Sequence, residues 1–346
     1  MVIKSLIAIP TLAVGSLFYI RKKSSSKWLN IDSHSNTITQ NLNGKAILIT
    51  GGNTGLGYQV ALELAKRQGT IVIACRDVEK GKKALEEITK QSGNTNVDCI
   101  PLDLGNLESV DAFSSQFKAK YPKVYAVVCN AGVWIPMEKK VKTEDNFEAH
   151  FGINHLGHFA LMKKLIPHLK ESGMKSRVVI VSSALMIHGK IDMNKKDFVY
   201  EGREDEAKDG KKSLIPTGYS DSKLMNALTC KYLANTYPIA KNSNVSYYAV
   251  CPGWCKTDLS RSVDVSFLKK VFIAPVAFMF MRSSVQGAQN ILHVTLEDDE
   301  TLTSGGFYRD GKIMEKESEY AEKLVEEDLD KKLWELSERL VTDRKD

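Results

Sequence analysis

The segment from Thr50 to Gly57 reads TGGNTGLG and directly follows the apolar run KAILI. Glycine is favoured where the backbone takes a positive φ or where another group approaches the main chain closely. The helix-period segment GYQVALELAKRQG overlaps the end of this stretch and continues beyond it. The order strand, glycine-rich turn, helix places an anionic group on the backbone N–H groups of a helix N-terminus. We therefore expect a nucleotide pyrophosphate at this turn.

Three of these glycines have distinct expected roles. Gly51 makes the tight turn, Gly55 admits the phosphates, and Gly57 lets the helix lie close to the strand. The spacing Gly-x3-Gly-x-Gly differs from the Gly-x-Gly-x2-Gly of the ordinary dinucleotide fingerprint. Taken alone, the motif is as consistent with a plain glycine-rich turn as with a phosphate site.

Short apolar runs alternate with amphipathic segments from Lys45 onward, and these runs are rich in valine and isoleucine. Strands that are apolar on both faces and separated by helices indicate a parallel sheet covered on both sides. The predicted class is α/β, with a single doubly wound parallel-sheet Rossmann domain over residues 44–315. Residues 316–346 have leucine and valine at helical spacing among charges, which predicts a C-terminal amphipathic helix packed on the domain.

Composition excludes several classes of function. The net charge of +6 comes from 48 basic and 42 acidic residues that are mixed along the chain, so a nucleic-acid interface is not indicated. Six cysteines in a chain of this length do not form a disulfide framework and favour a reducing compartment. No metal site is expected, because Cys251 and Cys255 lack a second ligand pair. His155 and His158 are interpreted as packing or helix-surface residues.

The N-terminus carries an uncharged stretch, Ser5 to Ile20, followed by Arg21, Lys22 and Lys23. It is slightly short for a membrane span, which needs about 17–25 residues. We interpret residues 1–23 as an uncleaved hydrophobic anchor in a membrane or on a lipid surface, with a cleaved or transit segment as the alternative. The excess of positive charge downstream places the bulk of the protein in the cytosol. Residues 24–43 are then a polar tether.

Six signatures occur in order: TGGNTGLG at 50–57, NAG at 130–132, Asn154 within INHLGHF, Ser183 after VVIVS, YSDSK at 219–223, and PG at 252–253. This series resembles the short-chain dehydrogenase/reductase family from about Gly44 to about residue 315. The segments ACRD, NHLGHF and SGGFYRDGK are similar to its retinol dehydrogenase branch, whose members are typically microsomal and NADP-dependent.

The YSDSK motif places Tyr219 and Lys223 on one face of a helix, one turn apart. An ammonium about 4–5 Å from the phenol favours the phenolate by about 3–4 kcal/mol at an effective dielectric near 20, so Tyr219 is the expected acid/base of a hydride transfer. A surface pair is the alternative for these two residues in isolation. The resemblance implies that Ser183 binds the reacting oxygen of the substrate and that Asn154 holds a water that relays protons to Lys223; strand capping is the alternative for Ser183.

Cofactor choice depends on Arg76, which follows the apolar run TIVIAC. An acidic residue at this place favours the ribose hydroxyls of NAD, whereas a nearby arginine accommodates the 2′-phosphate of NADP. Arg76 predicts NADP(H) over NAD(H), although Asp77 beside it is acidic. The resemblance assigns the remaining cofactor contacts to Gly51, Asn53, Thr54, Gly55, Leu56, Gly57, Asp103, Leu104, Asn130, Ala131, Gly132, Tyr219, Lys223, Pro252, Gly253 and Thr257.

Two segments depart from the family pattern. Residues 198–212 form a highly charged insertion between Ser183 and Tyr219, interpreted as a solvated loop that could border the substrate entrance. The segment Phe267–Met281 (FLKKVFIAPVAFMFM) is unusually apolar at the place where the family has its substrate lid. A core helix beneath the lid is the equally weighted alternative.

These observations predict an NADP-dependent oxidoreductase that interconverts a lipophilic alcohol and its aldehyde or ketone, such as a retinoid, a steroid or another lipid. The alternative is a catalytically silent nucleotide-binding scaffold on a lipid surface. Expected partners are the small-molecule substrate, a membrane or lipid-droplet surface and a second copy in a homodimer. The expected location is the endoplasmic reticulum membrane or a lipid droplet, with the catalytic domain facing the cytosol and mitochondria as the less favoured alternative.

If Ser5–Ile20 is an anchor, alkaline carbonate should not strip the full-length protein from microsomes, because the attachment is hydrophobic. Protease added to intact microsomes should digest the catalytic domain, since Arg21–Lys23 places it on the cytosolic side. A chain starting near Asn43 should still bind NADPH. Protection of the domain until detergent is added would reverse this topology.

Overall fold

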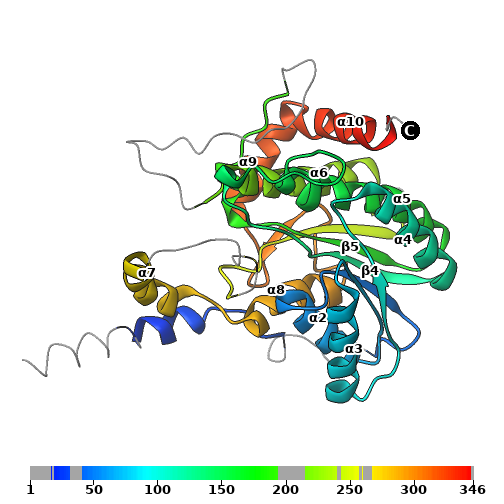
Figure 1. The fold of residues 1–346 in the computed structure, drawn as a ribbon, viewed down its shortest axis with the longest axis horizontal. Helices are drawn as coiled ribbons and strands as arrows, with labels where there is room; N and C mark the ends of the chain where they lie inside the picture. The colour runs from blue at the N-terminus through cyan, green and yellow to red at the C-terminus, as the bar shows by residue number, and fades with distance from the viewer. Residues whose placement is uncertain are drawn as a thin grey trace, which may run out of the picture.

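The computed structural model describes residues 17, 19–31, 41–193, 215–239, 243–256, 259 and 267–343. Its centre is one sheet with the strand order β3-β2-β1-β4-β5-β6-β7-β8, and helices lie on both sides of it (Figure 1). Every neighbouring pair from β3 to β7 is parallel, and only the β7–β8 pair is antiparallel. The predicted parallel α/β class is confirmed. The strands are β1 (Ala46–Thr50), β2 (Thr70–Cys75), β3 (Val97–Pro101), β4 (Val124–Cys129), β5 (Ser176–Val181), β6 (Val245–Val250), β7 (Phe307–Arg309) and β8 (Lys312–Ile313).

The apolar strands are explained by two separate cores, one on each face of the sheet. Successive side chains of a strand point to opposite faces, and in β1 Ile47 and Ile49 join one core while Leu48 joins the other. In Figure 1 one layer contains α2 (Gly55–Lys66), α3 (Val78–Ser92) and α8 (Ser284–Leu296), and the other contains α4 (Leu107–Lys120), α5 (Gly157–Glu171) and α6 (Thr217–Thr236).

The topology fixes where a ligand can bind. Strand β1 lies between β2 and β4, so the chain leaves β1 and β4 toward opposite faces of the sheet. Such a reversal opens a crevice at the carboxyl ends of the strands, where open α/β sheets bind their ligands. The glycine-rich turn follows β1, and the NAG segment at 130–132 follows β4, so both predicted cofactor segments border this crevice.

The C-terminal region forms two helices rather than the single one predicted. α9 (Glu315–Glu326) and α10 (Leu329–Thr342) are separated at Asp328, which has a φ of 58°. A left-handed residue cannot continue a right-handed helix, so the chain turns there. α10 packs on α6 and α5 and buries Leu333. The prediction that this region packs on the domain therefore describes both helices.

Part of the predicted tether packs on the domain. Leu29 and Ile31 are buried, and the N–H of Ile31 donates to Gln289 Oε1 at 3.0 Å. Within the described residues, no helix is both long and apolar enough to cross a membrane. Residues 1–16, which hold most of the apolar stretch, lie outside the described part of the chain, so the anchor stays a prediction.

The two departures from the family pattern have different outcomes. The insertion at 198–212 lies outside the described residues. The apolar segment forms α7 (Phe267–Phe280), which extends from one end of the domain in Figure 1. Val276, Phe278 and Phe280 on it are exposed. For these side chains the core-helix alternative is wrong.

Replacing Leu333 with alanine should lower the free energy of unfolding by about 2–5 kcal/mol, because it leaves a cavity between α10 and α6. Chemical denaturation monitored by circular dichroism measures this change. Glu335→Ala on the exposed side of α10 is the matched control and should change stability by about 0.5 kcal/mol or less. Equal stability of the two variants would show that α10 does not contribute to the core.

Candidate active site

The turn after β1 has the geometry expected for a phosphate cradle. Gly51 and Gly55 have φ values of 64° and 58°, which glycine adopts without steric cost. A Cβ at Gly57 would collide with the Gly51 carbonyl oxygen and with the Asn130 side chain, so α2 approaches the strand as the sequence predicts. The Thr54 side chain does not cap α2, and no acidic residue lies in the first turn. The first-turn N–H groups, which have no partner within a helix, therefore fit a pyrophosphate.

Thr50 fastens the NAG segment to the end of β1. Its Oγ1 accepts the N–H groups of Asn130 at 2.9 Å and Ala131 at 3.0 Å, and it lies 2.9 Å from His158 Nε2. His158 Nδ1 lies 3.1 Å from the carbonyl oxygen of Asn154. His158 is thus a neutral buried ring, with Nδ1 donating and Nε2 accepting, and burial lowers its pKa to about 4. The sequence analysis treated this histidine as packing and missed its bond to Thr50.

The four predicted catalytic residues lie together at the carboxyl end of β5. Ser183 follows that strand, and a hydrogen bond joins its side chain to Tyr219 on α6. Lys223 Nζ lies 5.5 Å from the centroid of the Tyr219 ring and donates to the Val181 carbonyl oxygen at 2.9 Å. A Cβ at Gly132 would lie 3.1 Å from Asn154 Oδ1 and 3.8 Å from Lys223 Nζ.

Asn154 is held by a distorted helix turn and by two chain segments. It lies in a π-helix at His150–Leu156. Its Oδ1 accepts the Val133 N–H at 2.7 Å, and its Nδ2 donates to Ser222 Oγ at 3.0 Å. Ser222 in turn donates to the Tyr219 carbonyl oxygen at 2.8 Å. π-bulges are frequent at functional sites because they displace a side chain from its regular register.

Two aromatic rings beside Tyr219 were missed by the sequence analysis. The Trp134 ring lies 4.5 Å from the Tyr219 ring, centroid to centroid, and His150 lies edge-on at 6.4 Å. His150 Nδ1 contacts Glu148 Oε1 at 2.6 Å, and its Nε2 accepts the Ile135 N–H at 3.0 Å. Trp134 lies two residues after the NAG segment, which was the signal available in the sequence for that ring. Both rings lie against the Tyr219 ring.

The electrostatics differ from the sequence-based expectation. Lys223 was expected to lower the pKa of Tyr219, but burial raises the pKa of Tyr219, and the bond with Ser183 opposes this only in part. Burial also lowers the pKa of Lys223 to about 8. Both shifts disfavour a charged pair, because transfer of a charge out of water costs more than one neighbouring charge returns. The protein alone therefore keeps Tyr219 protonated at neutral pH.

The candidate for cofactor selectivity lies at the end of β2. The side chain of Arg76 is 68% exposed, and its NH1 lies 3.8 Å from Asp103 Oδ2. Asp77 is the N-cap of α3, with Oδ1 accepting the Lys80 N–H at 3.1 Å and Oδ2 lying 2.8 Å from Lys80 Nζ. Since Asp77 is engaged in capping, Arg76 is the side chain available to a ribose or its phosphate.

Three other predicted cofactor residues, Gly253, Asp103 and Leu56, have defined contacts. Gly253 has a φ of 85° and packs against the Arg282 side chain. Asp103 Oδ1 accepts the Gly105 N–H at 2.8 Å, and Leu56 faces Gly287 on α8. Thr257 lies outside the described residues. The donors and glycines present fit a nicotinamide dinucleotide, with the cradle at β1 and the reacting end near Tyr219.

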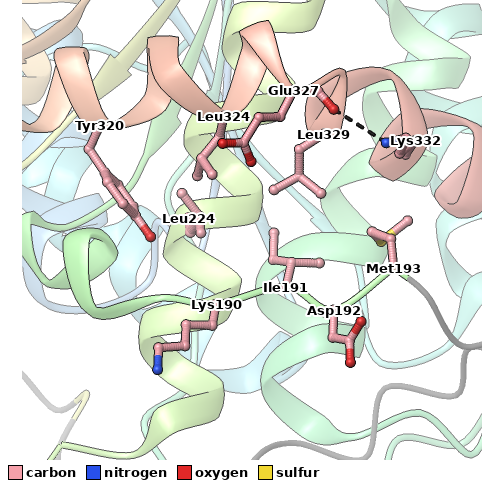
Figure 2. A pocket seen from close by; sticks show the side chains of 10 residues that line it. All are labelled: Lys190, Ile191, Asp192, Met193, Leu224, Tyr320, Leu324, Glu327, Leu329 and Lys332. Atoms are coloured by element: carbon pink, nitrogen blue, oxygen red, sulfur yellow. Dashed lines mark hydrogen bonds between the residues drawn. The ribbon is translucent and has the colours of Figure 1, made fainter.

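A separate cavity of about 410 Å³ lies between α6, α9, α10 and residues 190–193. In Figure 2 Leu224 points toward it from α6, and Tyr320, Leu324 and Leu329 approach from the C-terminal helices. None of the predicted catalytic or cofactor residues lines it. Tyr320 donates to the Gly189 carbonyl oxygen at 3.0 Å, which ties α9 to the segment after Ser183.

Comparisons with known proteins agree with this geometry. A family model described as short chain dehydrogenase matches residues 45–194. Mouse retinol dehydrogenase 12 is 37% identical over 298 residues, which are 86% of this chain and 86% of that protein. Human retinol dehydrogenase 11 is 36% identical over 79% of this chain and 80% of its own length.

Solved structures share the fold. A structure of an uncharacterized protein from Mycobacterium paratuberculosis has a TM-score of 0.62 and 27% identity, and the match covers 88% of this chain and 95% of that one. Salutaridine reductase from Papaver somniferum has a TM-score of 0.57 and 21% identity over 76% of this chain and 99% of its own. The chain thus belongs to the short-chain dehydrogenase/reductase family and is an NAD(P)-dependent enzyme of its retinol dehydrogenase-like branch.

Proposed function

We propose that this oxidoreductase prefers NADP(H) and interconverts a lipophilic alcohol and its aldehyde or ketone, with Tyr219 as the acid/base. The observation that carries the proposal is the convergence of Ser183, Tyr219, Lys223 and Asn154 beside the glycine cradle. A retinoid or similar lipid is the favoured substrate class, because the two curated relatives described above are named retinol dehydrogenases.

In the reductive direction, Ser183 and Tyr219 hold the carbonyl oxygen of the substrate by hydrogen bonds. The nicotinamide, when bound, supplies the hydride to the carbonyl carbon. Tyr219 gives its phenolic proton to the oxygen, so the product is the alcohol and Tyr219 is left as the phenolate. Lys223, 5.5 Å from the ring centroid, stabilises that charge. In the oxidative direction Tyr219 takes the alcohol proton.

Asn154 and Ser222 help to position Tyr219 and Lys223 through hydrogen bonds. Asn154 spans Val133 and Ser222, and Ser222 holds the backbone of Tyr219. The π-turn therefore fixes the position of α6 relative to the NAG segment. We assign Asn154 the task of holding a water that returns a proton toward Lys223, as the family resemblance implies.

NADP(H) preference is supported by Arg76 and by the capping role of Asp77. An arginine at the end of the second strand accommodates a 2′-phosphate. Asp77 is fixed toward Lys80, so it is not oriented to accept the ribose hydroxyls that NAD would present. The guanidinium of Arg76 is largely exposed, which leaves its donors accessible to a phosphate.

Replacing Tyr219 with phenylalanine removes the transferable proton and should lower kcat at least about a hundredfold, while NADPH binding persists. Steady-state turnover of retinaldehyde and a fluorescence titration with NADPH measure the two quantities. The matched control is Tyr247→Phe, because Tyr247 is buried on β6 and its hydroxyl has no hydrogen-bond partner among the described residues. Substantial turnover by the Tyr219 variant, or none by the wild type with any lipid aldehyde or alcohol, would contradict the proposal.

Replacing Arg76 with alanine should weaken NADPH binding about ten- to a hundredfold, the value of a charge-assisted contact of about 1.5–3 kcal/mol. NADH binding should hardly change. Lys82→Ala is the control, since it removes an equal exposed charge on α3, where it pairs with Glu79. Equal losses for both cofactors in the Arg76 variant would make Arg76 a structural residue.

A further inference from the structure

Helix α7 has no charged residue after Lys270 and yet has exposed apolar side chains. It contains FLKKVFIAPVAFMF, and Val276, Phe278 and Phe280 retain 46%, 42% and 47% of their accessible surface. Val276 and Phe280 lie one turn apart, whereas Phe278 lies on another side of the helix. A helical stretch that is apolar on more than one side is normally buried in a core or in lipid. Among the described residues, no part of the core covers these three side chains.

Other exposed apolar side chains continue the surface of α7. Trp254 is 48% exposed, and its carbonyl oxygen accepts the Arg282 N–H at 2.7 Å directly after α7. Val285 is 50% exposed at the start of α8. Tyr19 and Ile20 are 67% and 39% exposed on the N-terminal helix (residues 19–25), which lies beside α7 in Figure 1. We call this set the apolar face: Tyr19, Ile20, Trp254, Val276, Phe278, Phe280 and Val285.

Arg21 joins the N-terminal helix to α7. Its NH1 donates to the carbonyl oxygens of Phe278 at 2.9 Å and Met281 at 2.7 Å. The Phe278 carbonyl lies in the last turn of α7, and the Met281 carbonyl follows directly after the helix. Carbonyl groups at a helix C-terminus have no N–H partner within the helix and favour a cation. The Arg21 guanidinium also lies 4.7 Å from the centroid of the Trp28 ring.

The contact continues from Trp28 into the domain. The Arg282 guanidinium lies 5.1 Å from the centroid of the Trp28 ring and forms two hydrogen bonds of 2.7 Å with the Asp310 carboxylate. Asp310 Oδ1 also accepts the Leu29 N–H at 3.3 Å. These contacts fix the position of the N-terminal segment beside the end of α7.

The sequence on either side of this contact indicates what covers the apolar face. The uncharged stretch Ser5–Ile20 ends on the face itself, at Tyr19 and Ile20. Exposed Lys22, Lys23 and Lys27 follow it and complement anionic lipid headgroups. A lipid layer that takes up the apolar stretch therefore also contacts α7.

We propose that the apolar face is a second lipid-contacting surface, which inserts α7 and Trp254 into the same lipid layer that takes the N-terminal stretch. This inference rests on the proposed action on a lipophilic substrate. Trp254 follows Gly253 at the carboxyl end of β6, at the same end of the sheet as Ser183. Lipid contact there brings the mouth of the active site to the layer in which the substrate is dissolved.

Contact with lipid is tested with the full-length protein and vesicles of phosphatidylcholine and phosphatidylserine that carry brominated chains. Bromine quenches tryptophan fluorescence only on close approach, so the wild type should be quenched and Trp254→Phe should lose most of that quenching. Trp334→Phe is the control, because Trp334 is packed between Tyr232 and Phe159 in the domain. Equal quenching in wild type, Trp254→Phe and Trp334→Phe would overturn the proposal.

The consequence for activity is tested with the double variant Val276→Ser/Phe280→Ser. For retinaldehyde dissolved in vesicles, the KM should rise at least about tenfold, as expected for the loss of two inserted apolar side chains. The KM for a short water-soluble aldehyde should rise less than this, because no lipid layer delivers it. Ile239→Ser is the control, since Ile239 is 42% exposed beyond α6, near the amino end of β6.

The outcomes separate this inference from the proposed function. Quenching that depends on Trp254 in an enzyme without turnover would support the lipid surface and refute the proposed reaction. Normal turnover with an unchanged vesicle KM in the double variant would overturn the lipid surface alone. Self-association without vesicles that the double variant abolishes would overturn it in favour of a second copy of the chain.

Discussion

The arrangement of the candidate active site depends on the burial of Lys223 beside Tyr219. Lys223 and Tyr219 are both buried, and burial disfavours the charged form of each. A buried ammonium requires partners, because its transfer out of water is costly. The Val181 carbonyl oxygen is one partner, at 2.9 Å.

That requirement connects the site to the fold. Val181 is the last residue of β5, Gly132 follows β4, and Asn154 lies in the π-turn that precedes α5. These elements meet only because β4 and β5 are adjacent parallel strands, whose carboxyl ends lie at one edge of the sheet. α6 carries Tyr219 and Lys223, and α9 and α10 pack against it. The C-terminal helices therefore contribute to the site without entering it.

The strands and the glycine cradle could be predicted from the sequence, because their signals are local. A continuous apolar run such as AILIT predicts a strand covered on both faces, and Gly51, Gly55 and Gly57 predict a turn with a close helix. The order of motifs also predicted which side chains would meet at the catalytic site. Each of these properties depends on a few neighbouring residues.

Other properties depend on contacts between distant segments and could not be predicted. The π-turn at Asn154 is held by Val133 and Ser222, and the break in the C-terminal helix at Asp328 is a single backbone conformation. The direction of the Tyr219 pKa shift was expected from one neighbour, Lys223, whereas the burial of the whole site decides it. The contact of Arg21 with the end of α7 joins residues 257 and 260 positions apart.

We expect Tyr219 to stay protonated in the free protein and to ionise near neutral pH only when the positive charge of an oxidised nicotinamide lies beside it. An ultraviolet titration of the phenolate band, taken as the difference between wild type and Tyr219→Phe, isolates this residue among the 12 tyrosines. The account predicts that the difference band appears at a clearly lower pH with NADP⁺ bound than without it. The same titration midpoint in both states would contradict the account.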